Sequence, residues 1–227
     1  AETAGGLPAA AARRTAAGRE WGAMSGRAHP VGGFVLVGGR SRRMGRNKAW
    51  LRWDGRPLFL RAADCLRGYV AEVRLLGPAE TYSGFGFPVL PDRQPGRGPL
   101  EAVCTGLRHS PYEWNLFLAC DLPRVEGRWL ERLVESAGRG RADAVVPRVG
   151  GRWQPLCAAY HRRCLPAFER ALEESGGRLL SALARVRVEA LGRGGLAEDE
   201  EGERIFANVN TPQEWARVRL SGGGQLG

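Results

Sequence analysis

From Val31 onward, the chain alternates between short apolar runs and longer amphipathic stretches. Short apolar runs bounded by glycine, proline or charged residues indicate buried strands. Longer stretches with apolar positions three and four residues apart indicate helices. Strands that are apolar along most of their length are typical of a sheet that is covered on both faces. The pattern therefore predicts an α/β fold with a mostly parallel central sheet flanked by helices.

The same pattern places the individual elements and their boundaries. Proline near the start of a stretch and glycine at its end mark helices, as in residues 57–68. The predicted strands are 31–37, 71–76, 87–90, 115–119, 144–146, 154–160, 186–191 and 205–209, and the predicted helices are 57–68, 99–108, 127–137, 164–174, 179–184 and 212–220. The acidic stretch 192–204 is predicted to be a solvated loop.

The two ends of the chain lack this periodicity. Residues 1–28 are rich in alanine, glycine and arginine, which predicts a disordered N-terminal extension. Residues 29–220 are predicted to form a single domain, because the chain is rather short for two independent cores. Residues 221–227 are predicted to be a flexible tail.

Charge narrows the range of partners. The formal net charge of +10 suits nucleotides, nucleic acid, acidic lipids or a phosphorylated metabolite. Nucleic-acid binders more often concentrate charge in a stripe with aromatic residues between, whereas the densest basic cluster of this chain lies inside a glycine loop, at Arg40, Arg42, Arg43, Arg46 and Lys48. This placement favours a small phosphate ligand over nucleic acid.

The cysteines and the hydropathy of the chain indicate in which cell compartment the protein is expected. The five cysteines are odd in number and form no Cys-x-x-Cys pair, so neither a disulfide framework nor a zinc site is indicated. No apolar run approaches the roughly 20 residues that span a bilayer. We therefore expect a cytoplasmic protein with no membrane partner.

The segment after the first predicted strand has the chemistry of a phosphate-binding loop. Gly38 and Gly39 allow backbone N–H groups to approach phosphate oxygens closely, and Arg43 and Lys48 add positive charge. The spacing excludes the Walker pattern, because Lys48 lies three residues beyond Gly45 instead of directly after it. It also lacks the Gly-x-Gly-x-x-Gly of dinucleotide binders. A tight turn on a basic surface is the alternative reading.

Polar side chains follow three further predicted strands. Asp121 comes directly after the strand 115–119, and Asp92 follows the strand 87–90. Ligands of open α/β sheets bind at the carboxyl ends of strands, so one crevice is predicted to collect both aspartates and the glycine loop. Asn208 and Asn210 lie at the end of the strand 205–209, where alternation would turn both to one side. Each has a structural alternative: turn residues for the aspartates, and a helix start capped by Thr211 for the asparagines.

Together these residues resemble the molybdenum cofactor guanylyltransferase family. Residues 36–49 read Leu-Val-Gly-Gly-Arg-Ser-Arg-Arg-Met-Gly-Arg-Asn-Lys-Ala, where the family usually has Leu-Ala-Gly-Gly-x-Ser-x-Arg-Met-Gly-x-Asp-Lys. Four more motifs keep the family order: Gly98-Pro99-Leu100, Cys120-Asp121-Leu122-Pro123, Gln154-Pro155-Leu156 and Asn208-Val209-Asn210-Thr211-Pro212. The resemblance covers roughly residues 33–218. Its first motif alone would also suit related cytidylyl- and sugar-phosphate nucleotidylyltransferases.

The resemblance implies a Rossmann-like nucleotidyltransferase fold and a set of roles. It implies transfer of GMP from GTP to the terminal phosphate of molybdopterin, with release of pyrophosphate, Mg²⁺ as cofactor, and molybdenum cofactor delivery proteins as further partners. The implied catalytic residues are Arg43, Lys48 and Asp121. The GTP-binding residues would be Leu36, Val37, Gly38, Gly39, Lys48, Gly77, Asp92 and Asp121; the acceptor would meet Gln154, Asn208 and Asn210; the metal would bind Asp121, with Asn210 as a second candidate ligand.

Three positions depart from the family pattern. Val37 replaces the usual alanine, Asn47 replaces the usual aspartate before the lysine, and Gly77 stands where the family has an asparagine. The resemblance implies that this last change removes a side-chain contact to the nucleotide.

The competing functions are a cytidylyltransferase acting on the same pterin, a non-catalytic nucleotide-binding module and, from net charge alone, a nucleic-acid binder. The histidines lack ligand spacing and a serine or cysteine partner, so a catalytic triad is not expected.

Overall fold

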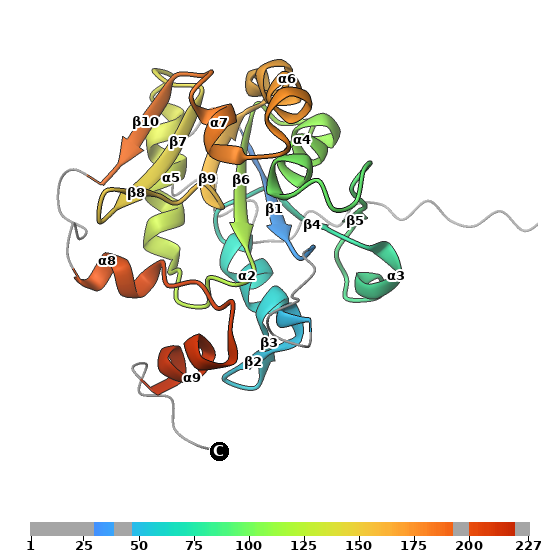
Figure 1. Cartoon of the computed structure of the whole chain (residues 1–227), viewed down its shortest axis with the longest axis vertical. Coiled ribbons are helices and arrows are strands. Elements are labelled where there is room, and N and C mark those ends of the chain that lie inside the picture. Colours follow the sequence, from blue (N-terminus) through green and yellow to red (C-terminus); the bar gives the residue numbers. More distant parts are fainter. Residues whose placement is uncertain (1–29, 39–46, 193–199, 221–227) are drawn as a thin grey trace, which may run out of the picture.

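The computed structural model describes residues 30–38, 47–192 and 200–220, and a twisted central sheet runs through them (Figure 1). Strand β1 (Val31–Leu36) lies inside the sheet, parallel to β4 (Glu72–Leu76) on one side and β6 (Trp114–Ala119) on the other. The strand order is β10-β7-β9-β6-β1-β4-β5, with β5 at Val89–Leu90, β7 at Ala144–Val149, β9 at Cys157–His161 and β10 at Val188–Leu191. Only β9 in this order runs against its neighbours, so the prediction of a mostly parallel sheet is confirmed.

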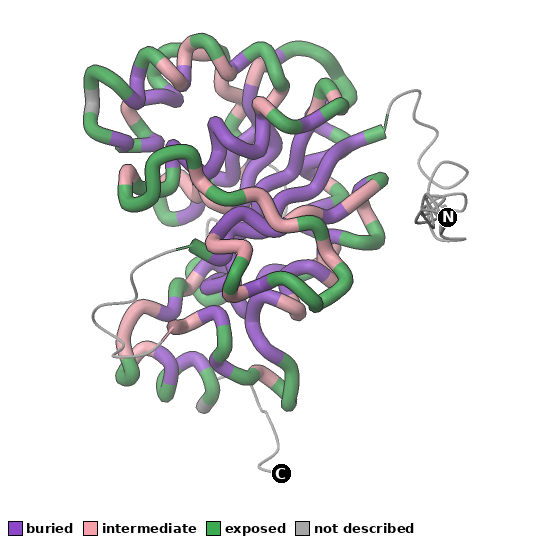
Figure 2. The backbone as a smooth tube through the Cα atoms, turned by 90° about the vertical axis from the view of Figure 1, so that its right-hand side faces the viewer, coloured by how far each residue is buried: buried purple, intermediate pink, exposed green. Residues whose placement is uncertain are grey.

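Helices cover both faces of the sheet because apolar side chains point both ways from the strands. Val35 faces α2 (Leu58–Arg67) and α5 (Gly127–Gly138), whereas Phe34 and Leu36 face the opposite layer. That layer consists of α4 (Pro99–His109), α6 (Leu165–Ser175) and α7 (Leu179–Leu183). Figure 2 shows the strands as a buried band between exposed outer turns. The apolar strands of the sequence are thus explained by two hydrophobic cores, one on each face.

Short elements complete the described chain. A hairpin of β2 (Arg52–Trp53) and β3 (Arg56–Pro57) precedes α2, and β8 (Arg152–Trp153) pairs with β7. The remaining helices are η2 (Lys48–Trp50), α3 (Ala79–Tyr82), η3 (Arg162–Cys164), α8 (Glu200–Ile205) and α9 (Pro212–Leu220). No helix of the described ranges is long and apolar enough to cross a membrane.

The prediction of a strand at 205–209 is wrong. Residues up to Ile205 belong to α8, and the segment from Ala207 to Asn210 joins no sheet. Ile205, Phe206 and Val209 are all buried, so their apolar pattern reflects packing of a helix end and the following turn, not alternation in a strand. The ring of Phe206 contacts that of Trp129 at 4.8 Å between centroids. The loop prediction for 192–204 is likewise wrong from Glu200 onward.

Other sequence boundaries need smaller corrections. Residues 154–156, predicted as the start of a strand, form a turn before β9, in which the Cys157 N–H donates to the carbonyl of Gln154 at 3.1 Å. The predicted extension 1–28 and tail 221–227 lie outside the described residues, as does the glycine-loop stretch 39–46.

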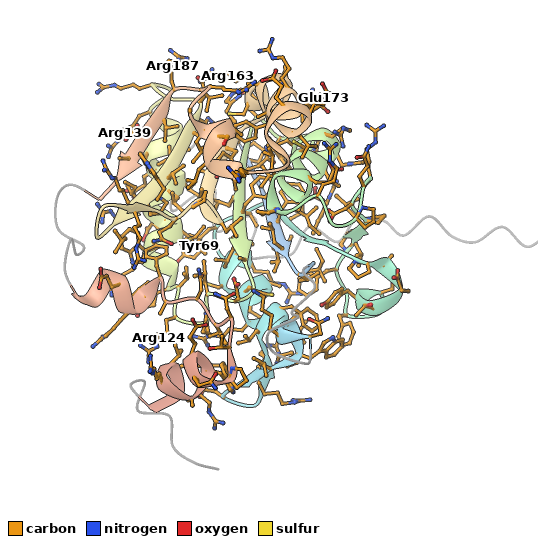
Figure 3. All side chains as sticks on the ribbon, in the orientation of Figure 1. Tyr69, Arg124, Arg139, Arg163, Glu173 and Arg187 are labelled. Atoms are coloured by element: carbon orange, nitrogen blue, oxygen red, sulfur yellow. The ribbon has the colours of Figure 1, made fainter. Side chains whose placement is uncertain are left out.

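A salt-bridge cluster joins β7 to neighbouring segments at one end of the molecule. The Asp143 carboxylate accepts hydrogen bonds from Arg163 and from the side chain and backbone of Arg187. Figure 3 labels these two arginines at the end of the molecule opposite Arg124. Hydrogen bonding to Arg187, and next to Arg163, holds the pKa of Asp143 well below its usual range. These two arginines of the basic chain therefore stabilise the fold through Asp143.

We predict that Asp143→Asn lowers the free energy of unfolding at pH 7 by about 1–2 kcal/mol, since charge-assisted hydrogen bonds are lost. Because the pKa of Asp143 is lower in the folded protein, its ionised carboxylate stabilises the fold at pH values above the unfolded-state pKa of about 3.9. This stabilisation is lost as the pH falls toward the folded-state pKa. Denaturant unfolding of both proteins should therefore show a difference that shrinks below about pH 4. A difference that stays constant down to pH 2 would contradict this role.

Candidate functional site

The carboxyl ends of four parallel strands meet at one edge of the sheet. After β1, the backbone N–H groups of Val37 and Gly38 both donate to the carbonyl of Leu76, at 3.0 and 3.1 Å. The N–H of Cys120 donates to the carbonyl of Leu36 at 3.2 Å. These bonds fix the start of the glycine loop between the ends of β4 and β6. The glycine turn and Asp121 therefore both lie at the carboxyl edge of the sheet, as predicted from the sequence.

Lys48, Asp121 and Asn210 converge at this edge. The Lys48 Nζ forms an ion pair with Asp121 Oδ2 and lies 3.2 Å from Asn210 Oδ1. Lys48 begins η2, whose N-terminal N–H group at Ala49 donates to the Asn47 side chain at 3.1 Å. The lysine and aspartate side chains are only 19% and 11% exposed, so solvent screens their interaction weakly. The structure thus brings together one cation, one carboxylate and one amide oxygen from three distant segments.

A helix cap holds Asn210 in this position. The Glu214 carboxylate accepts hydrogen bonds from the N–H groups of Asn210 and Thr211, at 2.7 and 3.0 Å. The Thr211 hydroxyl accepts from the Glu214 N–H at 3.1 Å, which completes a capping box at the start of α9. The buried Val209 N–H donates to the carbonyl of Asp121 at 3.1 Å. The capping role of Thr211 is confirmed, and it leaves the Asn210 side chain directed toward Lys48.

The carboxylate of Asp121 retains one open coordination position. Its Oδ1 atom is buried and has no hydrogen-bond partner within the described part of the chain. Burying such an oxygen is costly unless a cation or donor meets it. The described residues contain no cluster of three or more His, Cys, Asp or Glu that could cage a metal. A Mg²⁺ ion shared with phosphate oxygens needs few protein ligands, so Asp121 Oδ1 and the Asn210 amide oxygen fit that ion.

Asp92 lies beside the glycine turn, after the end of β5. A Cβ built on Gly38 would lie 3.8 Å from Asp92 Oδ2, so a ligand laid on this backbone passes close to the carboxylate. Asp92 Oδ1 is buried and unpartnered within the described residues. Burial, and then the charge of Glu101, raise the pKa of Asp92 above its usual value. The carboxylate is thus poised to accept hydrogen bonds from a bound ligand.

Two departures from the family pattern occupy the same space. A Cβ added at Gly77 would lie 2.7 Å from Val37 Cγ2 and 3.1 Å from the Gly38 nitrogen. Contacts under 3.0 Å require one group to move, so the valine side chain fills the volume that a side chain at position 77 would begin to use. Val37 therefore fits beside position 77 because that position is a glycine. Both lie directly against Gly38.

The residues predicted to bind the acceptor line one pocket. Gln154, Asn208 and Asn210 face a cavity of about 840 Å³ between the β8 turn and α9. Asn208 is exposed and Asn210 is half-buried, and the two reach the same pocket although they do not belong to a strand. Four arginines, which sequence analysis did not single out, also line it: Arg124, Arg152, Arg204 and Arg217.

Few features of the neighbouring sequence identify the pocket residues that were not predicted. The four arginines come from separate segments, and nothing in their spacing marks them among so many scattered arginines. Glu214 could have been found, because Thr211-x-x-Glu214 is a capping-box pattern. Gly39 and Arg43, predicted to bind and act on the triphosphate, lie outside the described residues, so their roles remain predictions.

Comparisons with known proteins agree with this architecture. Residues 33–189 match the family model described as MobA-like NTP transferase domain. A probable molybdenum cofactor guanylyltransferase of Pelotomaculum thermopropionicum is 34% identical over 83% of this chain and 91% of its own length. A molybdenum cofactor guanylyltransferase of Pseudomonas putida strain KT2440 is 33% identical, over 81% of this chain and 95% of its own.

A solved structure has the same fold. The crystal structure of molybdopterin-guanine dinucleotide biosynthesis protein A from Archaeoglobus fulgidus superposes with a TM-score of 0.73, at 24% identity, over 84% of this chain and 98% of the other. The family match and these relatives identify an enzyme of the nucleotidyltransferase class, and the sheet with a glycine turn, a carboxylate and a lysine at its carboxyl edge agrees with it. The matched residues and the relatives show that this chain belongs to the MobA-like NTP transferase family.

The pairing of Val37 with Gly77 can be tested by exchange. We predict that Gly77→Asn lowers the free energy of unfolding by about 1–3 kcal/mol, because the added side chain overpacks the valine. Adding Val37→Ala to that variant should recover most of the loss, as measured by denaturant unfolding of all four proteins of the cycle. Equal losses from Gly77→Asn with valine and with alanine at position 37 would contradict the pairing.

Proposed function

We propose that this enzyme transfers GMP from GTP to the terminal phosphate of molybdopterin and releases pyrophosphate. The observation that carries the proposal is the convergence of Lys48, Asp121 and Asn210 between the glycine turn and a basic pocket. The glycine turn on one side of these three residues suits a triphosphate, and the basic pocket on the other side suits an anionic acceptor. The names of the relatives from Pelotomaculum and Pseudomonas support the same reaction.

The proposed reaction is a substitution at the α-phosphorus of GTP. An oxygen of the acceptor phosphate forms the new P–O bond, and the bond to the β-phosphate breaks, so pyrophosphate leaves with that electron pair. The acceptor phosphate is already anionic at neutral pH and requires no base from the protein. Catalysis then rests on holding two anions together and compensating their repulsion. This need explains a site with a lysine, arginines and amide groups.

Lys48 and the glycine turn would bind the triphosphate. The N–H groups of Val37 and Gly38 are committed to Leu76, so these two residues serve mainly to shape the turn. Lys48 Nζ pairs with the carboxylate of Asp121, and its flexible side chain could move to a phosphate bound beside that carboxylate. We assign further contacts to Leu36, Gly39, Gly77 and Asp92, and phosphate binding to Arg43.

The metal of the proposed reaction is Mg²⁺, held by Asp121 with Asn210 as the second ligand. When bound, it would supply positive charge to the phosphate oxygens. The partnerless Oδ1 of Asp121 supports this assignment, because a hard cation prefers a carboxylate oxygen. Lys48 holds the other oxygen and thereby orients the carboxylate.

The pocket beyond Asn210 would bind the acceptor. Its four arginines outnumber its two acidic residues, and one of these, Glu214, is engaged in the helix cap. Figure 3 shows Arg124 beside α9, where its guanidinium donates to the carbonyl of Val218. Burial, and next the charge of Arg204, lower the pKa of Arg124, which indicates that the two arginines lie close together. Two cations sharing one pocket favour an anionic occupant.

Base choice follows from the relatives and not from the fold. The names of the relatives specify guanylyl transfer, whereas the glycine turn and Lys48 would hold the phosphates of GTP and CTP equally well. Five free cysteines, four of them buried, support a reducing compartment, for which we propose the cytoplasm. Proteins that deliver the molybdenum cofactor are further proposed partners.

The proposed reaction predicts pyrophosphate release that depends on both GTP and the acceptor. With molybdopterin and Mg²⁺ present, GTP should support release at least about tenfold faster than CTP, since a few base-specific hydrogen bonds are worth that factor. Release should require the acceptor. Faster release with CTP would favour the cytidylyltransferase alternative. Nucleotide binding without release would favour a non-catalytic module.

A further inference from the structure

The hydroxyl group of Tyr82 bridges the two sides of the glycine-loop segment. It donates a hydrogen bond to the carbonyl of Val37 at 3.1 Å and accepts one from the Asn47 side-chain amide at 2.8 Å. Val37 precedes the glycine- and arginine-rich segment in the sequence, and Asn47 follows it. Tyr82 itself ends α3, which follows β4. One hydroxyl thus ties together three separate segments at the carboxyl edge of the sheet.

The ring of Tyr82 is held rigidly. It is fully buried, and its centroid lies 5.2 Å from that of Phe59 on α2. The exposed ring of Trp50 lies nearly parallel to it at 6.0 Å. Burial raises the pKa of Tyr82 to about 12, so the hydroxyl keeps its proton at neutral pH. The hydrogen bond to Val37 is therefore available throughout the physiological range.

The chemistry of this bridge requires a hydrogen-bond donor at position 47, which the Asn47 amide supplies. A tyrosine hydroxyl has one proton, and the carbonyl of Val37 can only accept it. The other partner must then donate, which the Asn47 Nδ2 group does and an ionised aspartate cannot do. The Oδ1 atom of the same amide accepts from the Ala49 N–H. Asn47 thus supplies the donor that Tyr82 accepts from, which the aspartate of the family pattern would not supply in its ionised form.

We propose that Tyr82 is a positioning residue of the GTP site, acting through Val37 and Asn47 to fix Gly38 and Lys48 relative to each other. The proposal rests on the proposed function, in which Lys48 binds the triphosphate and Gly38 shapes the turn that faces it. Gly38 directly follows Val37, and Lys48 directly follows Asn47. If the bridge is lost, Leu76 still holds the glycine turn and Asp121 still holds the lysine, but no bond links the two directly. GTP binding must then fix their spacing, which weakens its affinity.

The test uses Tyr82→Phe, which keeps the ring and removes only the bridge. The equilibrium affinity for GTP with Mg²⁺ should fall about fivefold to tenfold, the effect of losing one or two hydrogen bonds. In turnover, KM for GTP should rise similarly while KM for molybdopterin stays within about twofold. General loss of structure would instead lower the amount of active enzyme and leave both KM values unchanged.

Asn47→Asp provides the second arm, because it keeps the Oδ1 acceptor for Ala49 and removes the donor to Tyr82. It should weaken GTP binding by a similar factor, and the double variant should be no weaker than the weaker single one. Ser136→Ala is the matched control. It removes a buried hydroxyl that donates to Glu189, away from the site, and should leave GTP affinity unchanged.

Unchanged GTP affinity in Tyr82→Phe, or additive effects of the two substitutions, would overturn the proposal. Its failure differs from failure of the proposed function. A wild-type protein that binds GTP but transfers nothing to molybdopterin would contradict the proposed reaction. The GTP affinities of the variants would still decide the role of Tyr82.

Discussion

The ion pair between Lys48 and Asp121 joins segments 73 residues apart, and the arrangement of the site depends on it. Lys48 compensates one oxygen of a carboxylate that the fold buries at the end of β6, and Asn210 adds an amide oxygen beside the same ammonium group. The other carboxylate oxygen stays without a partner in the described chain. A buried carboxylate with only one oxygen compensated favours the arrival of a cation, and this links the fold to metal-assisted phosphate chemistry.

Much of the sheet could be predicted because its strands are buried on both faces. Residues 31–37 and 115–119 are apolar at nearly every position, and they form the adjacent strands β1 and β6. The segment 205–209 misled for a physical reason: Ile205, Phe206 and Val209 are as apolar as a strand, but they bury themselves against α5 and the sheet face without pairing. A short apolar run does not reveal whether its backbone will find a neighbouring strand.

Site residues could be predicted where the neighbouring sequence fixes their place in the fold. They could not be predicted where their role depends on contacts between distant segments. Asp121 follows a strongly apolar strand, so its position at the carboxyl edge could be predicted from the sequence. Its pairing with Lys48 depends on how η2 folds back after the glycine segment. Tyr82 carried no local signal, because its hydroxyl acts on Val37 and Asn47, 45 and 35 residues away. The arginines of the pocket between β8 and α9 likewise meet only in three dimensions.

We propose that Asp121 holds Mg²⁺ together with the phosphate oxygens of a bound triphosphate. The most direct test is the affinity for GTP, measured by calorimetry with Mg²⁺ and with a chelator, in the wild-type protein and in Asp121→Asn. Mg²⁺ should tighten GTP binding at least about tenfold in the wild type, because a ligand carboxylate contributes on that scale, and less than about twofold in the variant. An Asp121→Asn protein in which Mg²⁺ tightens GTP binding as strongly as in the wild type would contradict it.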